Sequence, residues 1–162
     1  MKCTIPLLLA AFLIIAPAVA DGAPDRKSGP ATKRDDAAAL GVAGARYPHV
    51  SPDGKQIAFA LHGDLWVVPV EGGRATRLTL NESNDLKPVW SPDGKHLAFT
   101  SDRSGGFDLW TMPADGGVPT QLTFDGSMDH VCQFSPDGGS VIFQSTRTGS
   151  WRIFSVPVEG GT

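Results

Sequence analysis

The sequence predicts an all-β fold, a partial β-propeller of about three four-stranded blades whose last blade is incomplete. The tetrapeptide Ser-Pro-Asp-Gly recurs at 51–54, 91–94 and 135–138, which is about every 40 residues, the repeat length of a propeller blade. Each copy is followed by apolar residues with the two-residue period of a β-strand, and no helical period of comparable length appears. Closed propellers contain roughly 4 to 8 blades, so three units predict a fragment of a six- or seven-bladed ring.

The first two strands of each repeat flank this tetrapeptide. The first strand ends at Val50, Trp90 or Phe134, immediately before the serine. The second strand contains the related segments 56–59, 96–99 and 140–143, in which apolar residues alternate. Pro-Asp-Gly joins two antiparallel strands tightly, because proline fixes one backbone angle, aspartate accepts hydrogen bonds and glycine adopts a positive φ. We therefore interpret Asp53, Asp93 and Asp137 as turn formers and not as metal or substrate ligands.

The third and fourth strands complete a blade in the first two repeats. The third strand passes through Asp-Leu-Trp at 64–66 and 108–110, and through Arg-Ile-Phe at 152–154. It is expected to end at Pro69, Pro113 or Pro157, because proline cannot donate to a sheet ladder. The fourth strand is expected at 76–79 and 120–123, and the third repeat stops before its fourth strand.

The amino end predicts export. Lys2 precedes an apolar run at 5–15, and Ala-Val-Ala at 18–20 provides small residues for cleavage after Ala20. The run is shorter than the roughly 20 residues of a membrane span, so no stable anchor is expected after cleavage. The predicted organisation is a signal peptide at 1–20, a flexible linker at 21–44 and propeller repeats at 45–162.

Composition and motifs exclude several functions. The formal net charge is −3, which does not favour nucleic acid. The sequence lacks a nucleophile elbow, a His-Glu-x-x-His metal motif and a phosphate-binding loop, so no catalytic residue, metal or cofactor is expected. The histidines His49, His62, His96 and His130 are interpreted as scattered, exposed residues of turns.

These motifs resemble the WD40-like repeat of TolB-type proteins and, most closely, the amino-terminal propeller of tricorn-like serine peptidases. The segments that carry the likeness are Ala-Arg-Tyr-Pro at 45–48, Gly-Asp-Leu-Trp at 63–66 and Ser-Asp-Arg-Ser-Gly-Gly-Phe-Asp at 101–108. The resemblance implies a periplasmic propeller that admits and guides peptides, with the peptidase chemistry in later domains that this sequence does not contain. Prolyl oligopeptidase-type peptidases and secreted amidohydrolases carry similar repeats. The third repeat departs from the pattern, because Arg152 stands where the others have Asp64 and Asp108.

Binding residues are expected on the longer loops, which lie together at one end of the blades. These loops span 81–87, 101–107, 125–130 and 145–151, and loops on a rigid scaffold often carry binding residues. The candidates for protein or peptide binding are Asp85, Asp102, Arg103, Asp129, His130, Arg147 and Trp151. The alternative is that these side chains only solvate and hold the loops.

Two functions follow. The chain is a noncatalytic module that binds a protein or peptide, or it is the amino-terminal propeller of a periplasmic hydrolase whose catalytic domain is absent from this sequence. We also expect self-association, because the outer faces of the first and last blades carry apolar strands that a propeller normally covers.

Overall fold

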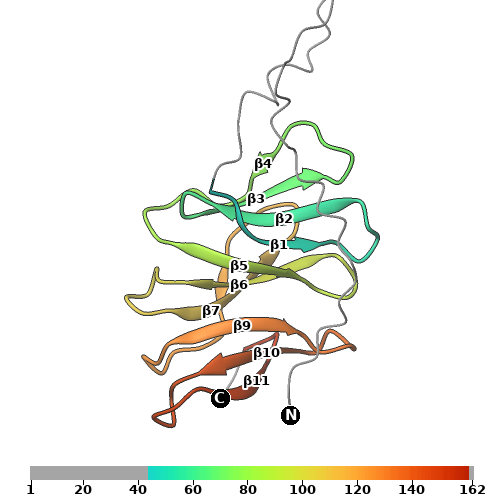
Figure 1. Ribbon diagram of the computed structural model, residues 1–162. Helices are drawn as coiled ribbons and strands as arrows, with labels where there is room; N and C mark the ends of the chain where they lie inside the picture. The colour runs from blue at the N-terminus through green and yellow to red at the C-terminus, as the bar shows by residue number, and fades with distance from the viewer. Residues whose placement is uncertain (1–43, 161–162) are drawn as a thin grey trace, which may run out of the picture. The chain divides into compact units, whose positions relative to one another are not determined.

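A computed structural model describes residues 44–160, which form three antiparallel sheets in chain order (Figure 1). Blade 1 consists of β1 (Arg46–Val50), β2 (Gln56–Leu61), β3 (Asp64–Pro69) and β4 (Thr76–Arg77). Blade 2 repeats this order with β5 (Asp85–Trp90), β6 (His96–Ser101), β7 (Asp108–Pro113) and β8 (Thr120–Gln121). Blade 3 contains β9 (Asp129–Phe134), β10 (Ser140–Ser145) and β11 (Arg152–Pro157). The predicted all-β partial propeller with an incomplete third blade is confirmed.

The predicted signal peptide and nearly all of the predicted linker lie outside the described residues. Within residues 44–160, no helix is long and apolar enough to cross a membrane.

The Ser-Pro-Asp-Gly turns have the predicted structural role. In blade 2, the Ser91 hydroxyl donates to Asp93 Oδ1 at 2.6 Å and accepts the His96 amide at 2.9 Å. Asp93 Oδ1 also accepts the Lys95 amide at 3.0 Å. Blades 1 and 3 contain the same three hydrogen bonds. The hydrogen bond from the serine, followed by the backbone amide, lowers the pKa of each turn aspartate, so these carboxylates stabilise the turns in their ionised form.

The two ends of each blade therefore differ. The turn end carries the Ser-Pro-Asp-Gly turns and the Gly-Gly segments that follow the third strands. The long-loop end carries the connections from second to third strands and from one blade to the next. The third strands end at Pro69, Pro113 and Pro157, as predicted.

The first strands of blades 1 and 2 contain the same bulge. Pairing shifts register between Arg46 and His49 in β1, and between Leu86 and Val89 in β5. Tyr47 and Lys87, which each precede a proline, have φ values of 56° and 53°. A positive φ is uncommon for residues other than glycine, and bulges redirect side chains.

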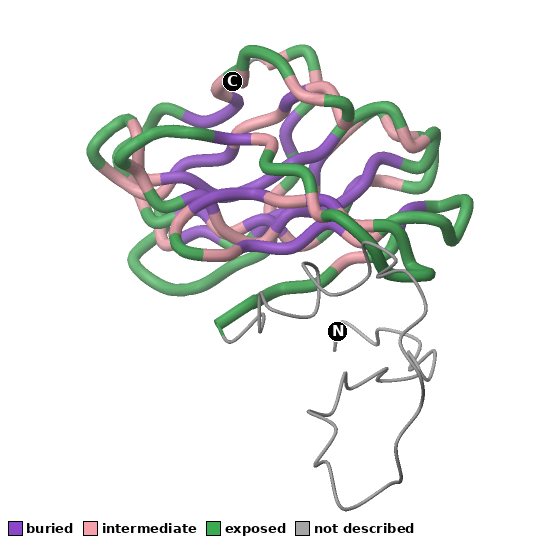
Figure 2. The backbone as a smooth tube through the Cα atoms, turned by 90° about the horizontal axis from the view of Figure 1, so that it is seen from above, coloured by how far each residue is buried: buried purple, intermediate pink, exposed green. Residues whose placement is uncertain are grey.

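The cores lie between blades. Ala58, Leu65 and Val67 of blade 1 share a buried cluster with Trp90 and Phe99 of blade 2. A second cluster joins blades 2 and 3, and includes Ala98, Leu109, Leu122, Val131, Phe134, Val141 and Phe143. Figure 2 shows buried positions concentrated in the strands and exposed positions in the connections. Each internal sheet face is thus covered by the neighbouring blade, as expected for radially packed blades.

Two predictions about the loops were wrong. The loops 81–87 and 125–130 are shorter than expected, because β5 begins at Asp85 and β9 at Asp129, where each aspartate pairs with the serine that ends the second strand. Only His62 of the four histidines lies in a turn, whereas His49, His96 and His130 belong to β1, β6 and β9. Their apolar neighbours continue the strand pattern, and this pattern outweighed the polarity of the imidazole rings.

Candidate functional site

Arg103 and Asp85, two of the predicted binding residues, form a buried ion pair. Arg103 Nη2 lies 2.6 Å from Asp85 Oδ1, and its Nε donates to the Ser101 hydroxyl at 2.9 Å. The guanidinium lies over the rings of Phe99 and Trp110, at 5.2 and 4.8 Å from their centroids. The charge of the guanidinium is therefore paired with Asp85, and its flat face contacts aromatic rings of the same blade.

Blade 3 contains the same arrangement around Arg147. Its Nη2 lies 2.9 Å from Asp129 Oδ2, and its Nε donates to the Ser145 hydroxyl at 3.0 Å. Phe143 and Phe154 lie beneath the guanidinium at 4.9 and 5.0 Å. Since Asp85 and Asp129 are fully buried, these four candidates hold the ends of the strands and present little free polar surface to a ligand.

The Asp102 carboxylate also has partners within its own blade. Its oxygens accept the Asn84 amide at 2.7 Å and the Asn84 side-chain amide at 2.8 Å. At the same position of blade 3, the Thr146 hydroxyl accepts the Met128 amide at 3.2 Å. Asp102 therefore holds the loop that enters blade 2.

His130 and Trp151 belong to a group that we call the inner-strand cluster: Tyr47, Lys87, Phe107, His130 and Trp151. Lys87 Nζ lies 2.8 Å from His130 Nδ1 and 5.7 Å from the centroid of the Tyr47 ring. The His130 ring contacts Trp151 edge-on at 5.3 Å and Phe107 at 5.8 Å. The cluster takes residues from all three blades, because β5, the first strand of blade 2, contacts both β1 of blade 1 and β9 of blade 3.

The protonation of His130 follows from these contacts. An ammonium group only donates, so His130 Nδ1 accepts from Lys87 and the neutral ring carries its proton on Nε2. Burial lowers the pKa of His130, and the charge of Lys87 lowers it further against the opposing influence of Asp129. The Nε2 atom is buried without a hydrogen-bond partner among the described residues.

The inner-strand cluster can therefore offer one positive charge and several aromatic surfaces. Among residues 44–160, Lys87 forms no ion pair with a carboxylate. Tyr47 and Trp151 are 41% and 51% exposed, so their rings remain available for contacts. A cation beside exposed aromatic rings suits acceptor oxygens and apolar side chains, which peptides supply together.

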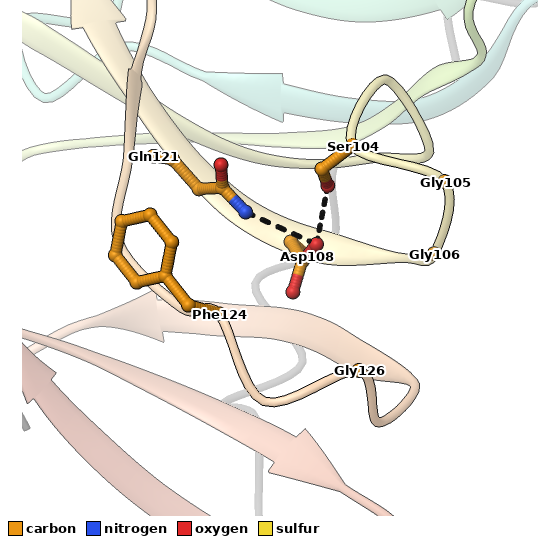
Figure 3. Close-up of a pocket in the computed structure, with 7 residues that line it drawn as sticks. All are labelled: Ser104, Gly105, Gly106, Asp108, Gln121, Phe124 and Gly126. Atoms are coloured by element: carbon orange, nitrogen blue, oxygen red, sulfur yellow. Dashed lines mark hydrogen bonds between the residues drawn. The ribbon is translucent and has the colours of Figure 1, made fainter.

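A separate open hollow of about 510 Å³ lies at the long-loop end of blade 2 (Figure 3). Asp108 lies in its wall and accepts hydrogen bonds from the Ser104 hydroxyl and from Gln121 Nε2. The Phe124 ring borders the hollow and is 72% exposed. The Asp108 carboxylate is already occupied by these internal donors, so the hollow offers an aromatic surface with few free polar groups.

The contacts of Asp108 also explain why the first residue of the third strand differs among the repeats. In blade 1, Asp64 Oδ2 lies 2.5 Å from Arg77 Nη2, and in blade 2 Gln121 of the fourth strand replaces that arginine. The aspartate therefore connects the third strand to the fourth. Blade 3 has Arg152 at this position and no fourth strand among the described residues.

Among residues 44–160, no three His, Cys, Asp or Glu side chains gather closely enough to hold a metal ion.

The repeats and the blade geometry now allow comparison with known proteins. The family model of the tricorn protease N-terminal β-propeller domain matches residues 42–162. The chain belongs to this family. Tricorn protease homolog 1 of Streptomyces coelicolor is 42% identical over 60 residues, which cover 37% of this chain and 5% of that protein.

TolB proteins are similar as well. The Tol-Pal system protein TolB of Desulfosudis oleivorans is 42% identical over 57 residues, which cover 33% of this chain and 13% of that protein. The crystal structure of TolB from Acinetobacter baumannii has a TM-score of 0.64 and 26% identity, and the match covers 73% of this chain and 31% of that one. The tricorn-type propeller described here thus spans a small part of the length of its relatives.

Sequence reasoning missed Tyr47 and Lys87. The signal was present in the repeat, because Tyr-Pro at 47–48 and Lys-Pro at 87–88 occupy equivalent positions. We expected Lys87 in a loop, whereas it lies in the bulge of β5 with its side chain beside residues of the two other blades. The use of the seven predicted residues in ligand binding stays a prediction.

Proposed function

We propose that this tricorn-type propeller is an exported module that binds a protein or peptide and is noncatalytic in itself. The binding surface is the inner-strand cluster together with the adjoining long-loop end. The observation that carries the proposal is the Lys87 ammonium, which lies between the Tyr47 ring and His130 without a carboxylate partner among the described residues. A peptide would supply an acceptor for this charge and side chains for the exposed rings of Tyr47 and Trp151.

Equilibrium binding of fluorescein-labelled casein peptides, followed by fluorescence anisotropy, tests this proposal. Lys87→Gln removes the charge and keeps a similar side-chain length, so we expect at least about a tenfold weaker affinity, which corresponds to about 1.4 kcal/mol. Trp151→Ala is expected to weaken binding to a similar degree, because buried aromatic contacts dominate many interfaces.

Lys95→Gln is the matched control, because Lys95 lies at the turn end and is exposed. An equal loss of affinity in Lys87→Gln and Lys95→Gln would mean nonspecific attraction of charge. Absence of binding to the unmodified chain, or reproducible peptide hydrolysis by it, would overturn the proposal.

The second candidate function is the propeller part of a periplasmic hydrolase, with a tricorn-like serine peptidase favoured over a prolyl oligopeptidase-type peptidase or an amidohydrolase. Two findings support it: the family match, and the small fraction of its relatives' length that this chain covers. Sequencing the gene beyond codon 162 tests it: further blades followed by a peptidase domain are expected, and an amidohydrolase metal motif would redirect the assignment.

Export is part of the same proposal. We expect the protein in the periplasmic fraction with Asp21 as its first residue, because cleavage after Ala20 follows the small residues at 18–20. Amino-terminal sequencing of the purified protein measures this, and an intact Met1 in the soluble protein would contradict it.

A further inference from the structure

Several Asp-Gly pairs lie among residues 44–160, and they differ in how the aspartate carboxylate is held. The aspartates of these pairs are Asp53, Asp93, Asp115, Asp125 and Asp137. In an Asp-Gly pair the glycine nitrogen can attack the preceding carboxyl group, because glycine has no side chain that hinders the approach. The contacts of each carboxyl group therefore decide how readily its pair reacts.

The three turn aspartates are held away from this reaction. Asp93 Oδ1 accepts the Ser91 hydroxyl at 2.6 Å and the Lys95 amide at 3.0 Å, and blades 1 and 3 contain the same bonds. These bonds favour the ionised carboxylate and lower its pKa, whereas cyclisation needs the protonated carboxyl group, from which water can leave. Gly94 also packs near blade 1, since a Cβ on this glycine would lie 3.8 Å from the Pro52 Cδ atom.

The Asp125 carboxylate is held by other contacts. Its Oδ2 atom lies 2.9 Å from Arg147 Nε, and its Oδ1 atom accepts the Ser127 amide at 3.0 Å. Arg147 is in turn fixed by the buried Asp129. Rotation of the Asp125 carboxyl group toward the nitrogen of Gly126 would therefore break an ion pair.

Asp115 differs from these four residues. It is exposed in the connection between β7 and β8, and its carboxylate forms no hydrogen bond or ion pair with the described residues. A Cβ on Gly116 would have no heavy atom within 4 Å, so the segment has room to rotate. The Gly116 amide donates to the Pro113 carbonyl at 3.1 Å, and the Gly94 amide makes an equivalent bond at 2.9 Å. The free carboxylate is therefore the feature that distinguishes Asp115.

The other two repeats have a longer side chain at the position of Asp115. The Gly-Gly pair follows Glu71 in blade 1 and Glu159 in blade 3. Glutamate would have to close a six-membered imide, which forms more slowly than the five-membered ring that aspartate gives. Among these three equivalent positions, only blade 2 thus has a side chain of the length that cyclises rapidly.

We propose that Asp115 is a site of spontaneous isomerisation to isoaspartate. The Gly116 nitrogen attacks Asp115 Cγ and a C–N bond forms, while a carboxyl oxygen leaves as water with one proton from the carboxyl group and one from the amide. The reaction is intramolecular and needs no cofactor, oxidant or reductant.

Water then opens the succinimide ring at one of its two carbonyl groups. Addition at the side-chain carbonyl restores aspartate. Addition at the main-chain carbonyl of Asp115 leaves the chain linked through the side-chain carbonyl, which is isoaspartate. The product has one more methylene group in the main chain of the connection that leads to β8. This inference does not depend on peptide binding at the inner-strand cluster.

Incubation of the purified chain at neutral pH and physiological temperature, followed by endoproteinase Asp-N digestion and mass spectrometry, tests the proposal. The protease cleaves before aspartate and not before isoaspartate, so isomerisation of Asp115 leaves an uncleaved peptide spanning 108–124. We expect this peptide to accumulate several times faster than the uncleaved peptides that report on Asp93 and Asp125. Equal or slower accumulation at Asp115 would overturn the proposal.

Asp115→Glu is the matched control, because it keeps the charge and introduces the residue of the other two repeats. Methyl transfer by a protein isoaspartate methyltransferase measures total isoaspartate, and we expect it to fall in this variant without a change in melting temperature. Undiminished methyl transfer to the variant would overturn the assignment to Asp115.

Two further measurements test whether the turn contacts protect the other aspartates. Ser91→Ala removes the hydroxyl that holds Asp93, so isomerisation is expected to increase at Asp93 and to stay unchanged at Asp115. In urea, which removes the turns, we expect the Asp-Gly pairs to react at similar rates. A lead of Asp115 that persists in urea would overturn the role of the folded structure in selecting this site.

Discussion

Blades 1 and 2 are alike at the turn end and different at the long-loop end. Ser51 and Ser91 each donate to an aspartate at 2.6 Å and each accept a backbone amide at 2.9 Å. At the other end, His62 and Gly63 join β2 to β3 directly, whereas the connection at 102–107 of blade 2 contributes Arg103 to an ion pair with Asp85.

This difference shows which parts of a repeat specify the blade and which specify its surface. The turn end depends on local hydrogen bonds within six residues, so the same short sequence produces the same structure three times. The long-loop end depends on contacts between segments that are distant in sequence, such as Arg103 with Asp85. Each repeat can therefore change its loops without losing its strands.

The largest effect on stability is expected from Asp85→Ala, which removes the carboxylate that pairs with Arg103. The substitution leaves a largely buried guanidinium without its carboxylate and Asn81 without an acceptor, so we expect a loss of about 3 kcal/mol in the free energy of unfolding. Urea denaturation followed by tryptophan fluorescence measures the loss.

Asp102→Ala is the control in the same loop region. It removes exposed hydrogen bonds to Asn84, which are expected to contribute about 1 kcal/mol. A smaller loss for Asp85→Ala than for Asp102→Ala would mean that Arg103 does not need its partner, and Arg103 would again be a candidate ligand-binding residue.

An intermediate loss of stability is expected at acidic pH, because two histidines of the first strands, His49 in β1 and His130 in β9, have lowered pKa values. Burial lowers the pKa of His49, whose Nδ1 accepts the Trp90 amide at 3.2 Å, and burial and Lys87 lower the pKa of His130. The unfolded chain therefore takes up protons at a higher pH than the folded chain. Stability is full above the ordinary histidine pKa of about 6.5 and falls as pH decreases through the lowered folded values.

Urea denaturation between pH 7.5 and pH 5 measures this dependence. His49→Gln and His130→Gln are each expected to reduce the slope of stability against pH, and the double variant more than either single variant. The two single variants also show whether the contact of His49 with Trp90 or that of His130 with Lys87 is more sensitive to acid. An unchanged slope in the double variant would show that other groups cause the acid sensitivity.

The sequence repeat predicted the positions of the strands, but it did not predict which side chains contact one another. The strand ends at Trp90 and Pro113 followed from turn and proline chemistry, which acts locally. The pairing of Asp85 with Ser101, which brings Arg103 to the carboxylate, depends on the register between β5 and β6. The position of Lys87 beside His130 depends on how two blades pack, and no short sequence pattern encodes that distance.

The smallest effect is expected at the short turn of blade 1, and it is stabilising. His62 and Gly63 have φ values of 52° and 86°, the signs of a type I′ hairpin turn, for which Asn-Gly is the preferred sequence. His62→Asn is expected to raise the free energy of unfolding by about 0.5 kcal/mol, because asparagine tolerates this conformation better. Gly63→Ala is the opposing variant, since its added Cβ would lie 3.3 Å from the Ser83 carbonyl oxygen at a positive φ. Thermal melting of the two variants measures the difference. Stabilisation by Gly63→Ala would contradict the turn assignment and, with it, the contrast between this two-residue turn and the longer connection at 102–107 of blade 2.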